Sequence, residues 1–278
     1  MTKFFRTWKL MGCCWRFLKQ DTELLIFPLI SGNCCLVLAL SYILPLFFTG
    51  LWRPPVEDAG PVWQVAYYAM WFLFYAANYF IVIFFNCALV ACATIRMGGG
   101  DPTVGDGLRA ASSRLPSIIG WALVSATVGL ILKIIEERSE KIGAIVAAIL
   151  GTAWSVVTYL VVPVLVVERK GPIAAFRESA VLLKKTWGEQ LIGNSSFSTV
   201  FFVLGIPAYG IIYLGAVSHS GLMFLGCLAV AIGYFILLAL VQSALQGIYQ
   251  AAVYLYARNG QVPEGFAEEY LRGAMVSR

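Results

Sequence analysis

The 278-residue chain is 60% hydrophobic and 13% charged, against roughly 45–50% and 25% for soluble domains. This composition indicates an integral membrane protein, and the length leaves no room for a separate soluble domain. The seven cysteines are an odd number and lie mostly inside apolar stretches, so a disulfide framework is not expected.

Six apolar runs of near or full bilayer length follow one another along the chain. They cover residues 24–51, 62–95, 117–132, 142–167, 191–217 and 221–257. The predicted fold is therefore all-α, a single membrane domain over residues 1–278. Its six transmembrane helices form three pairs, and a cytoplasmic interfacial amphipathic helix precedes each pair.

The distribution of charge predicts the topology. Of the 20 Lys and Arg residues, 16 lie on the N-terminal segment, the C-terminal tail and the two long connections between pairs, and 4 lie on the opposite side. Basic residues favour the cytoplasmic face. We therefore expect a multi-pass protein of the cell (inner) membrane with both termini cytoplasmic, and no nucleic-acid partner despite the net charge of +5.

The first segment has the pattern of a surface helix. Its apolar residues recur at spacings of three and four and so form one stripe: Phe4, Trp8, Met11, Trp15 and Leu18. Basic residues occupy the other side, as in helices that lie flat on anionic membranes.

Three joints, each with Arg, then Gly, then Pro, end successive apolar runs: 96–102, 169–172 and 258–263. Gly permits the left-handed turn after a helix, and Pro suits the first turn of the next. Short amphipathic segments follow at 102–115, 172–187 and 263–275. In the second of these, one apolar stripe is formed by Ile173, Phe176, Ala180, Leu183 and Trp187. The joints divide the chain into repeat-like units 1–97, 98–170 and 171–262 and a cytoplasmic amphipathic tail, 263–278.

Uncharged polar residues lie inside the spans. Residues eight or four apart share a helix face, which groups Asn78 with Asn86 and Gln242 with Gln246 and Gln250, while Asn194 and Ser195 begin the fifth span. Unpaired amides are costly in hydrocarbon. These side chains therefore either join helices by hydrogen bonds or line a polar cavity open to the cytoplasm for a lipid headgroup or small solute.

The sequence shows no catalytic or metal-binding motif. The single histidine, His219, has only serine neighbours in an outer turn, and Gly98 to Gly100 lack the Lys-Ser/Thr of a phosphate loop. Ion-coupled carriers require an ionisable residue at the centre of a span. This sequence places none there. We expect no enzyme activity, no metal and no cofactor.

Two groups of residues carry a resemblance: Asn86 to Val90 with Arg96 to Gly100, and Val162 to Val164 with Lys185 to Glu189. Over nearly its whole length the chain resembles a prokaryotic family of six-span membrane proteins of unknown function. It is similar, more loosely, to the membrane part of some bacterial phosphodiester hydrolases, without their catalytic domain. The resemblance implies a membrane location and no activity.

The favoured functional hypothesis is a non-catalytic membrane protein that engages anionic lipid or organises membrane through a basic cytoplasmic collar. The collar residues are Lys3, Arg6, Lys9, Arg16, Arg109, Arg114, Arg177, Lys184 and Lys185. The alternatives are a transporter or channel for a small solute or amphiphile, and third a membrane enzyme. Membrane lipids are the expected partners, with a homo-oligomer or another membrane protein as further possibilities.

Overall fold

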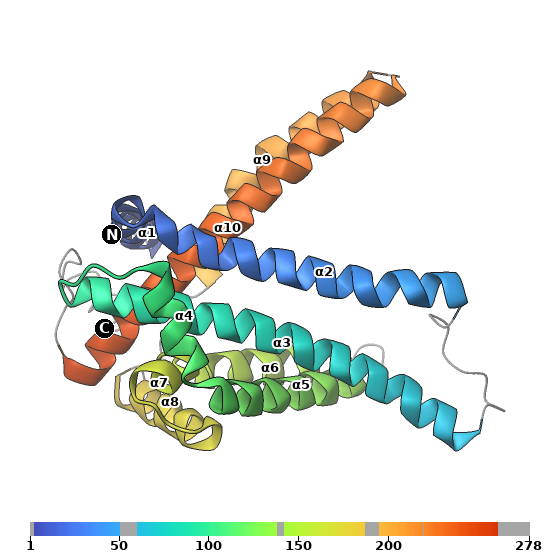
Figure 1. Cartoon of the computed structure of the whole chain (residues 1–278). Helices are drawn as coiled ribbons and strands as arrows, with labels where there is room; N and C mark the ends of the chain where they lie inside the picture. The colour runs from blue at the N-terminus through green and yellow to red at the C-terminus, as the bar shows by residue number, and fades with distance from the viewer. Residues whose placement is uncertain (1–2, 51–59, 138–141, 187–194, 219, 261–278) are drawn as a thin grey trace.

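The computed structural model describes residues 3–50, 60–137, 142–186, 195–218 and 220–260, and every regular element in them is helical (Figure 1). The elements are α1 (Lys3–Gln20), η1 (Thr22–Leu25), α2 (Ile26–Thr49), α3 (Pro61–Met97), α4 (Val104–Ser112), α5 (Leu115–Glu137), α6 (Ile142–Val157), α7 (Val161–Val167), α8 (Pro172–Thr186), α9 (Ser195–Val217) and α10 (Gly221–Asn259). The predicted helix at 263–275 and His219 lie outside the described residues.

Six helical stretches are long and apolar enough to cross a membrane: Thr22–Thr49, Val62–Met97, Leu115–Glu136, Ile142–Val167, Val200–Val217 and Gly221–Asn259. For the described residues, the prediction of an all-helical fold with six apolar helices of membrane-spanning length is confirmed. By length and composition, the chain is a multi-pass membrane protein.

Helix α3 is the centre of the assembly and packs against α2, α4, α5, α7 and α10. Its 37 residues extend about 55 Å, well beyond a hydrocarbon core of roughly 30 Å. In Figure 1, α2, α3, α5 and α6 run side by side, whereas α9 and the first part of α10 diverge from them as a separate hairpin. All of these spans meet at the end of the molecule that carries α1, α4, α7 and α8, which we call the short-helix end.

The buried core lies at the short-helix end. Leu89 of α3, Leu165 of α7 and Ile248 of α10 are almost fully buried there. Farther from this end the large apolar side chains are exposed, with Phe48 of α2 at 82% and Leu222 of α10 at 84%. Exposed apolar side chains on spanning helices are positioned to contact lipid chains.

The three joints turn in different ways. Gly99 and Gly260 adopt the left-handed backbone at the first and third joints, with φ of 83° and 67°. At the second joint the left-handed residue is Arg169, with φ of 58°, so the expectation that Gly171 makes this turn is wrong. A left-handed non-glycine residue carries a steric cost, and the second joint must therefore be held by other contacts.

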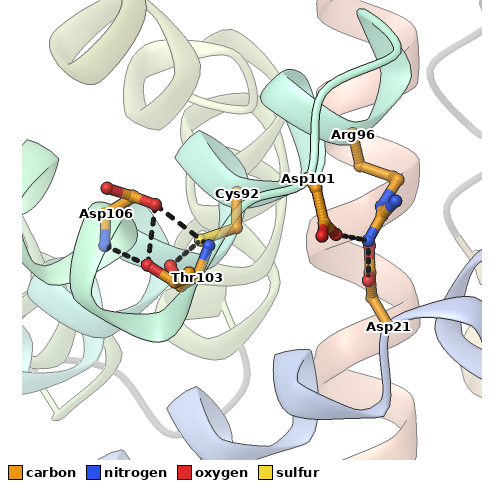
Figure 2. A network of polar contacts seen from close by, with 6 residues as sticks. All are labelled: Asp21, Cys92, Arg96, Asp101, Thr103 and Asp106. Atoms are coloured by element: carbon orange, nitrogen blue, oxygen red, sulfur yellow. Dashed lines mark hydrogen bonds and ion pairs between the residues drawn. The ribbon is translucent and has the colours of Figure 1, made fainter.

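Helix α4 begins at Val104, two residues after Pro102, where the sequence predicted its first turn. Thr103, not Pro102, is its N-cap: the Thr103 hydroxyl accepts from the Asp106 N–H at 3.2 Å, and the Asp106 carboxylate accepts from the Thr103 N–H at 3.1 Å (Figure 2). Gly107 lets this helix lie directly on α3, since a Cβ there would be 2.8 Å from the Ala88 carbonyl oxygen.

Helix α8 packs through small residues rather than through its predicted stripe alone. Ala175 and Ser179 are completely buried, whereas Ile173 from the stripe is 54% exposed. Phe176, also from the stripe, stacks on Trp154 of α6, with ring centroids 5.5 Å apart, and on Trp121 of α5. Small side chains permit close helix contact, and apolar periodicity does not detect them.

Candidate functional site

A polar cavity of about 280 Å³ lies between α2, α3 and α10. Its lining side chains are Pro28, Ser31, Val82, Phe85, Asn86, Leu89, Tyr159, Ser243, Gln246, Gly247 and Gln250. Among the described residues that line the cavity, none is charged. Three amides and two serine hydroxyls thus share a space inside the spanning region.

The close contact of α3 with α10 brings the amides together. Gln246 and Gln250 are one turn apart on α10 and so share a face. Gly247 lies between them, and a Cβ there would be only 2.2 Å from Leu89 Cδ2. The missing side chain allows α10 to approach α3 near Asn86, whose Nδ2 donates to Gln250 Oε1 at 3.4 Å.

The fourth span is broken beside this cavity, which the continuous apolar run did not predict. α6 ends at Val157 and α7 begins at Val161. Pro163 has no N–H to donate to the carbonyl of Tyr159, four residues earlier. The Gln250 side-chain Nε2 donates to that carbonyl instead, so α10 supplies the hydrogen bond that proline removed.

Ser179 of α8 forms hydrogen bonds with two further backbone groups at the break between α6 and α7. Its hydroxyl donates to the Val157 carbonyl at 2.6 Å and accepts from the Leu160 N–H at 3.2 Å. Ser179 is fully buried. Unpaired backbone groups are costly at membrane depth, and here side chains from two other helices pair them.

The amides of the cavity therefore have different roles. The amide oxygen of Gln250 accepts from Asn86, and its amide nitrogen donates to the Tyr159 carbonyl. Gln250 therefore links α3 to the break between α6 and α7. Within the described residues, Gln246, Ser31 and Ser243 have no hydrogen-bond partner, although all three line the cavity. These three side chains are available to water or a ligand.

Other predicted cavity residues lie elsewhere. Asn78 donates to the Phe74 carbonyl of its own helix at 2.9 Å and is not part of the lining, and neither is Gln242. Asn194 lies outside the described residues, and Ser195 is the first residue of α9 with its side chain not described. The structure thus brings together Asn86, Gln246 and Gln250 from the predicted set.

A charged cluster closes the first joint (Figure 2). The guanidinium of Arg96, at the end of α3, donates from Nε and Nη2 to the two carboxylate oxygens of Asp21. Nη2 also contacts Asp101 Oδ1. This two-pronged geometry is the strong form of an Arg–carboxylate pair, and it ties the connection between α1 and α2 to the end of α3.

A second cluster holds the second and third joints together. Lys170 Nζ lies 2.8 Å from both Glu168 Oε2 and Glu178 Oε2. Arg258, at the end of α10, reaches Glu178 Oε1 at 3.1 Å and Glu168 Oε1 at 3.6 Å, and the Tyr254 hydroxyl donates to Glu168 Oε1 at 3.0 Å. These contacts surround Arg169 and explain how its left-handed backbone is maintained.

The second cluster shifts the pKa values of its members. The hydrogen bond from Lys170 holds the pKa of Glu178 below its ordinary value of 4.5, with Arg258 adding to the effect. Hydrogen bonds to Glu168 and then Glu178 raise the pKa of Lys170 above 10.5. Both shifts favour the charged forms, so the ion pairs are fully formed near neutral pH.

The predicted collar cations have several environments. Arg16 of α1, Arg109 of α4, and Arg177 and Lys184 of α8 are exposed, and they form no ion pair within the described chain. Arg114 is half-buried, and its Nε has no hydrogen-bond partner among the described residues. Lys3, Arg6, Lys9 and Lys185 belong to helices, but their side chains are not described.

Sequence reasoning missed Ser31 and Tyr159 at the cavity, and the acidic partners at the joints. A signal for Tyr159 exists, since a proline four residues later always leaves a carbonyl without its helical donor. Asp21 and Glu168 likewise stand next to helix ends that carry basic residues. In the described ranges, no three His, Cys, Asp or Glu side chains gather as a metal site would require.

Comparison with known proteins gives a family and no activity. A family of unknown function (DUF6159) matches residues 65–265, which extend from α3 past the end of α10. No curated protein and no solved structure matches the chain. The expectation of a family without known activity is confirmed, while a prokaryotic origin and the similarity to hydrolase membrane parts stay predictions. Since the match covers most of the chain, the protein belongs to this family of unknown function (DUF6159).

Proposed function

We propose that this protein is a non-catalytic membrane protein that engages anionic phospholipid through exposed cations at its short-helix end. The observation that carries the proposal is the division of charge there. The acidic residues Asp21, Glu168 and Glu178 form ion pairs with the cations at the ends of the spans, which are Arg96, Lys170 and Arg258. The exposed cations Arg16, Arg109, Arg177 and Lys184 remain, and within the described residues none of them forms an ion pair.

The arrangement of these cations suits a flat anionic surface. They come from α1, α4 and α8, which gather at one end of the molecule in Figure 1. A Lys or Arg near an anionic bilayer contributes about 1 kcal/mol to binding. In this proposal α1, α4 and α8 are amphipathic helices at the cytoplasmic interface, both termini are cytoplasmic, and the membrane is the cell (inner) membrane.

Lipid retention tests the proposal. The protein, purified in mild detergent with phosphatidylglycerol and phosphatidylcholine, is examined by native mass spectrometry. Combining Arg109→Gln, Arg177→Gln and Lys184→Gln is expected to weaken phosphatidylglycerol binding on the order of a hundredfold and to leave phosphatidylcholine unchanged. Lys133→Gln, at the far end of α5, is the control. Equal phosphatidylglycerol retention by the triple variant and the wild type contradicts the proposal.

The alternative function is transport of a small solute or amphiphile. Its supporting observation is a broken span beside a polar cavity, an arrangement that transporters use for substrate sites. Uptake of labelled glycerol into proteoliposomes, abolished by Gln246→Leu, is the expected result. Uptake no faster than in empty liposomes rejects the alternative for this solute.

A further inference from the structure

Three side chains with unused hydrogen-bonding capacity line one cavity. Ser31 of α2 and Ser243 and Gln246 of α10 have no partner in the described chain, yet they lie in apolar helices that cross the membrane. A polar group left unpaired in hydrocarbon costs free energy. The native state therefore supplies either water or a ligand to these groups.

The chemistry of the lining selects an uncharged ligand. No described lining residue is charged, and an ion without a counter-charge is very costly in a low-dielectric region. A carboxamide both donates and accepts, and so does a serine hydroxyl. Asn86 adds an amide oxygen, since its amide nitrogen is the group that bonds Gln250. Hydroxyl groups, which also donate and accept, are the natural complement.

The size and position of the cavity suit more than one water molecule. A volume of about 280 Å³ far exceeds the roughly 30 Å³ share of one water. The lining includes Val82, which is 51% exposed, and the exposed Ser243, so the cavity reaches the outer surface of the spanning region. A headgroup attached to a lipid chain could therefore enter from the side.

We propose that this cavity binds an uncharged polyhydroxyl group, such as a sugar or glycerol moiety. Gln246, Ser243 and Ser31 contact the ligand, while Gln250 holds the site by linking Asn86 to the Tyr159 carbonyl. The moiety comes either from the headgroup of a neutral lipid or from a free solute. This site does not involve the exposed cations, so its existence is independent of anionic-lipid engagement.

Native mass spectrometry of the full chain in a sugar-free detergent tests the site. The probes are monoglucosyl diacylglycerol, diacylglycerol without the sugar, and free methyl glucoside. The wild type is expected to retain the glucolipid in preference to diacylglycerol. Gln246→Leu is expected to weaken glucolipid binding about fivefold or more, the effect of one lost hydrogen bond. Gln242→Leu makes the same change one turn away, outside the lining, and is expected to leave binding unchanged.

The outcomes separate the sources and the alternatives. Retention of glucolipid alone assigns the moiety to a lipid, and retention of methyl glucoside with the same dependence on Gln246 assigns it to a free solute. Binding of neither sugar probe above diacylglycerol overturns the proposal and leaves a water-filled cavity. Equal losses in Gln246→Leu and Gln242→Leu also overturn it. If Gln246→Leu does not fold, Ser243→Ala takes its place with the same expectation.

Discussion

The two halves of α10 lie in opposite environments although they belong to one helix. In residues 221–243 most of the large apolar side chains are exposed, as at Leu222 and Leu237. In residues 244–254 almost every side chain is buried, including Leu245 and Tyr254. The buried half is nevertheless the one that contains Gln246 and Gln250.

This difference follows from the solvent. Lipid chains are as apolar as leucine, so burying a leucine against another helix brings little gain. Close packing at small residues and hydrogen bonds between helices supply the association instead. The half of α10 that contains Gln246, Gly247 and Gln250 is therefore the half that joins α3. The first half pairs with α9 and leaves most of its large apolar side chains to contact lipid.

The largest expected effect comes from adding one methyl group to each half. Gly247→Ala is expected to destabilise the protein by about 2–3 kcal/mol, because its Cβ would lie 2.2 Å from the buried Leu89 side chain and overpack the contact. Gly233→Ala, on the exposed half with nothing within 4 Å, is expected to be neutral or slightly stabilising. Unfolding by SDS in mixed micelles measures both free energies.

This pair of variants can also contradict the proposed difference between the two halves of α10. If both alanines cost the same free energy, the contact at Gly247 does not hold α10 against α3. A cost at Gly233 larger than at Gly247 would mean that the face of α10 at Gly233 packs against protein rather than lipid.

A smaller effect is expected at Gln250. Gln250→Leu makes the buried half more apolar, yet it should cost about 1–2 kcal/mol, because the Tyr159 carbonyl loses the donor that replaces the N–H of Pro163. The same unfolding measurement applies, and Gln242→Leu should change stability by less than about 0.5 kcal/mol.

A double variant sharpens this prediction. Pro163→Ala returns a backbone N–H four residues after Tyr159. Gln250→Leu should therefore cost less in the Pro163→Ala background than in the wild type, with a coupling of about 1 kcal/mol. The same cost in both backgrounds would show that Gln250 does not compensate for the proline.

The smallest effect concerns the end of α10, where Arg258 meets Glu178. Glu178→Gln is expected to lower stability by about 1 kcal/mol at neutral pH, since the pair is partly exposed. The pKa of Glu178 is lowered in the folded state, so its contribution is complete above about pH 4.5 and is lost as the pH falls through the lowered value. The stability difference between wild type and variant should disappear over that acid range.

Glu23→Gln is the matched control for this titration, because Glu23 is exposed and joins no ion pair in the described residues. It should leave stability unchanged at every pH. A difference between Glu178→Gln and the wild type that persists at low pH would mean that the Glu178 side chain stabilises α8 by packing rather than by charge.

The sequence determined the features that depend on residues near one another in the chain. Six apolar runs predicted six spans because hydrocarbon thickness requires about 20 apolar residues per helix, and the described part of the structure contains six helices long and apolar enough to span. The spacing of four placed Gln246 and Gln250 on one helix face. The glycines predicted the left-handed residue correctly at two of the three joints. At the second joint the left-handed residue is Arg169 instead, and a charged cluster that includes residues of α8 and α10 holds that turn.

Only the tertiary structure decided which polar groups meet. Asn86 and Asn78 share a helix face, but only Asn86 lines the cavity, because α10 approaches α3 at Gly247. The partner of Gln250 is a backbone carbonyl freed by Pro163, at a break inside an apolar run that periodicity treats as continuous. Contacts between distant segments depend on how closely two helix surfaces can approach, and side-chain spacing within either helix does not contain that information.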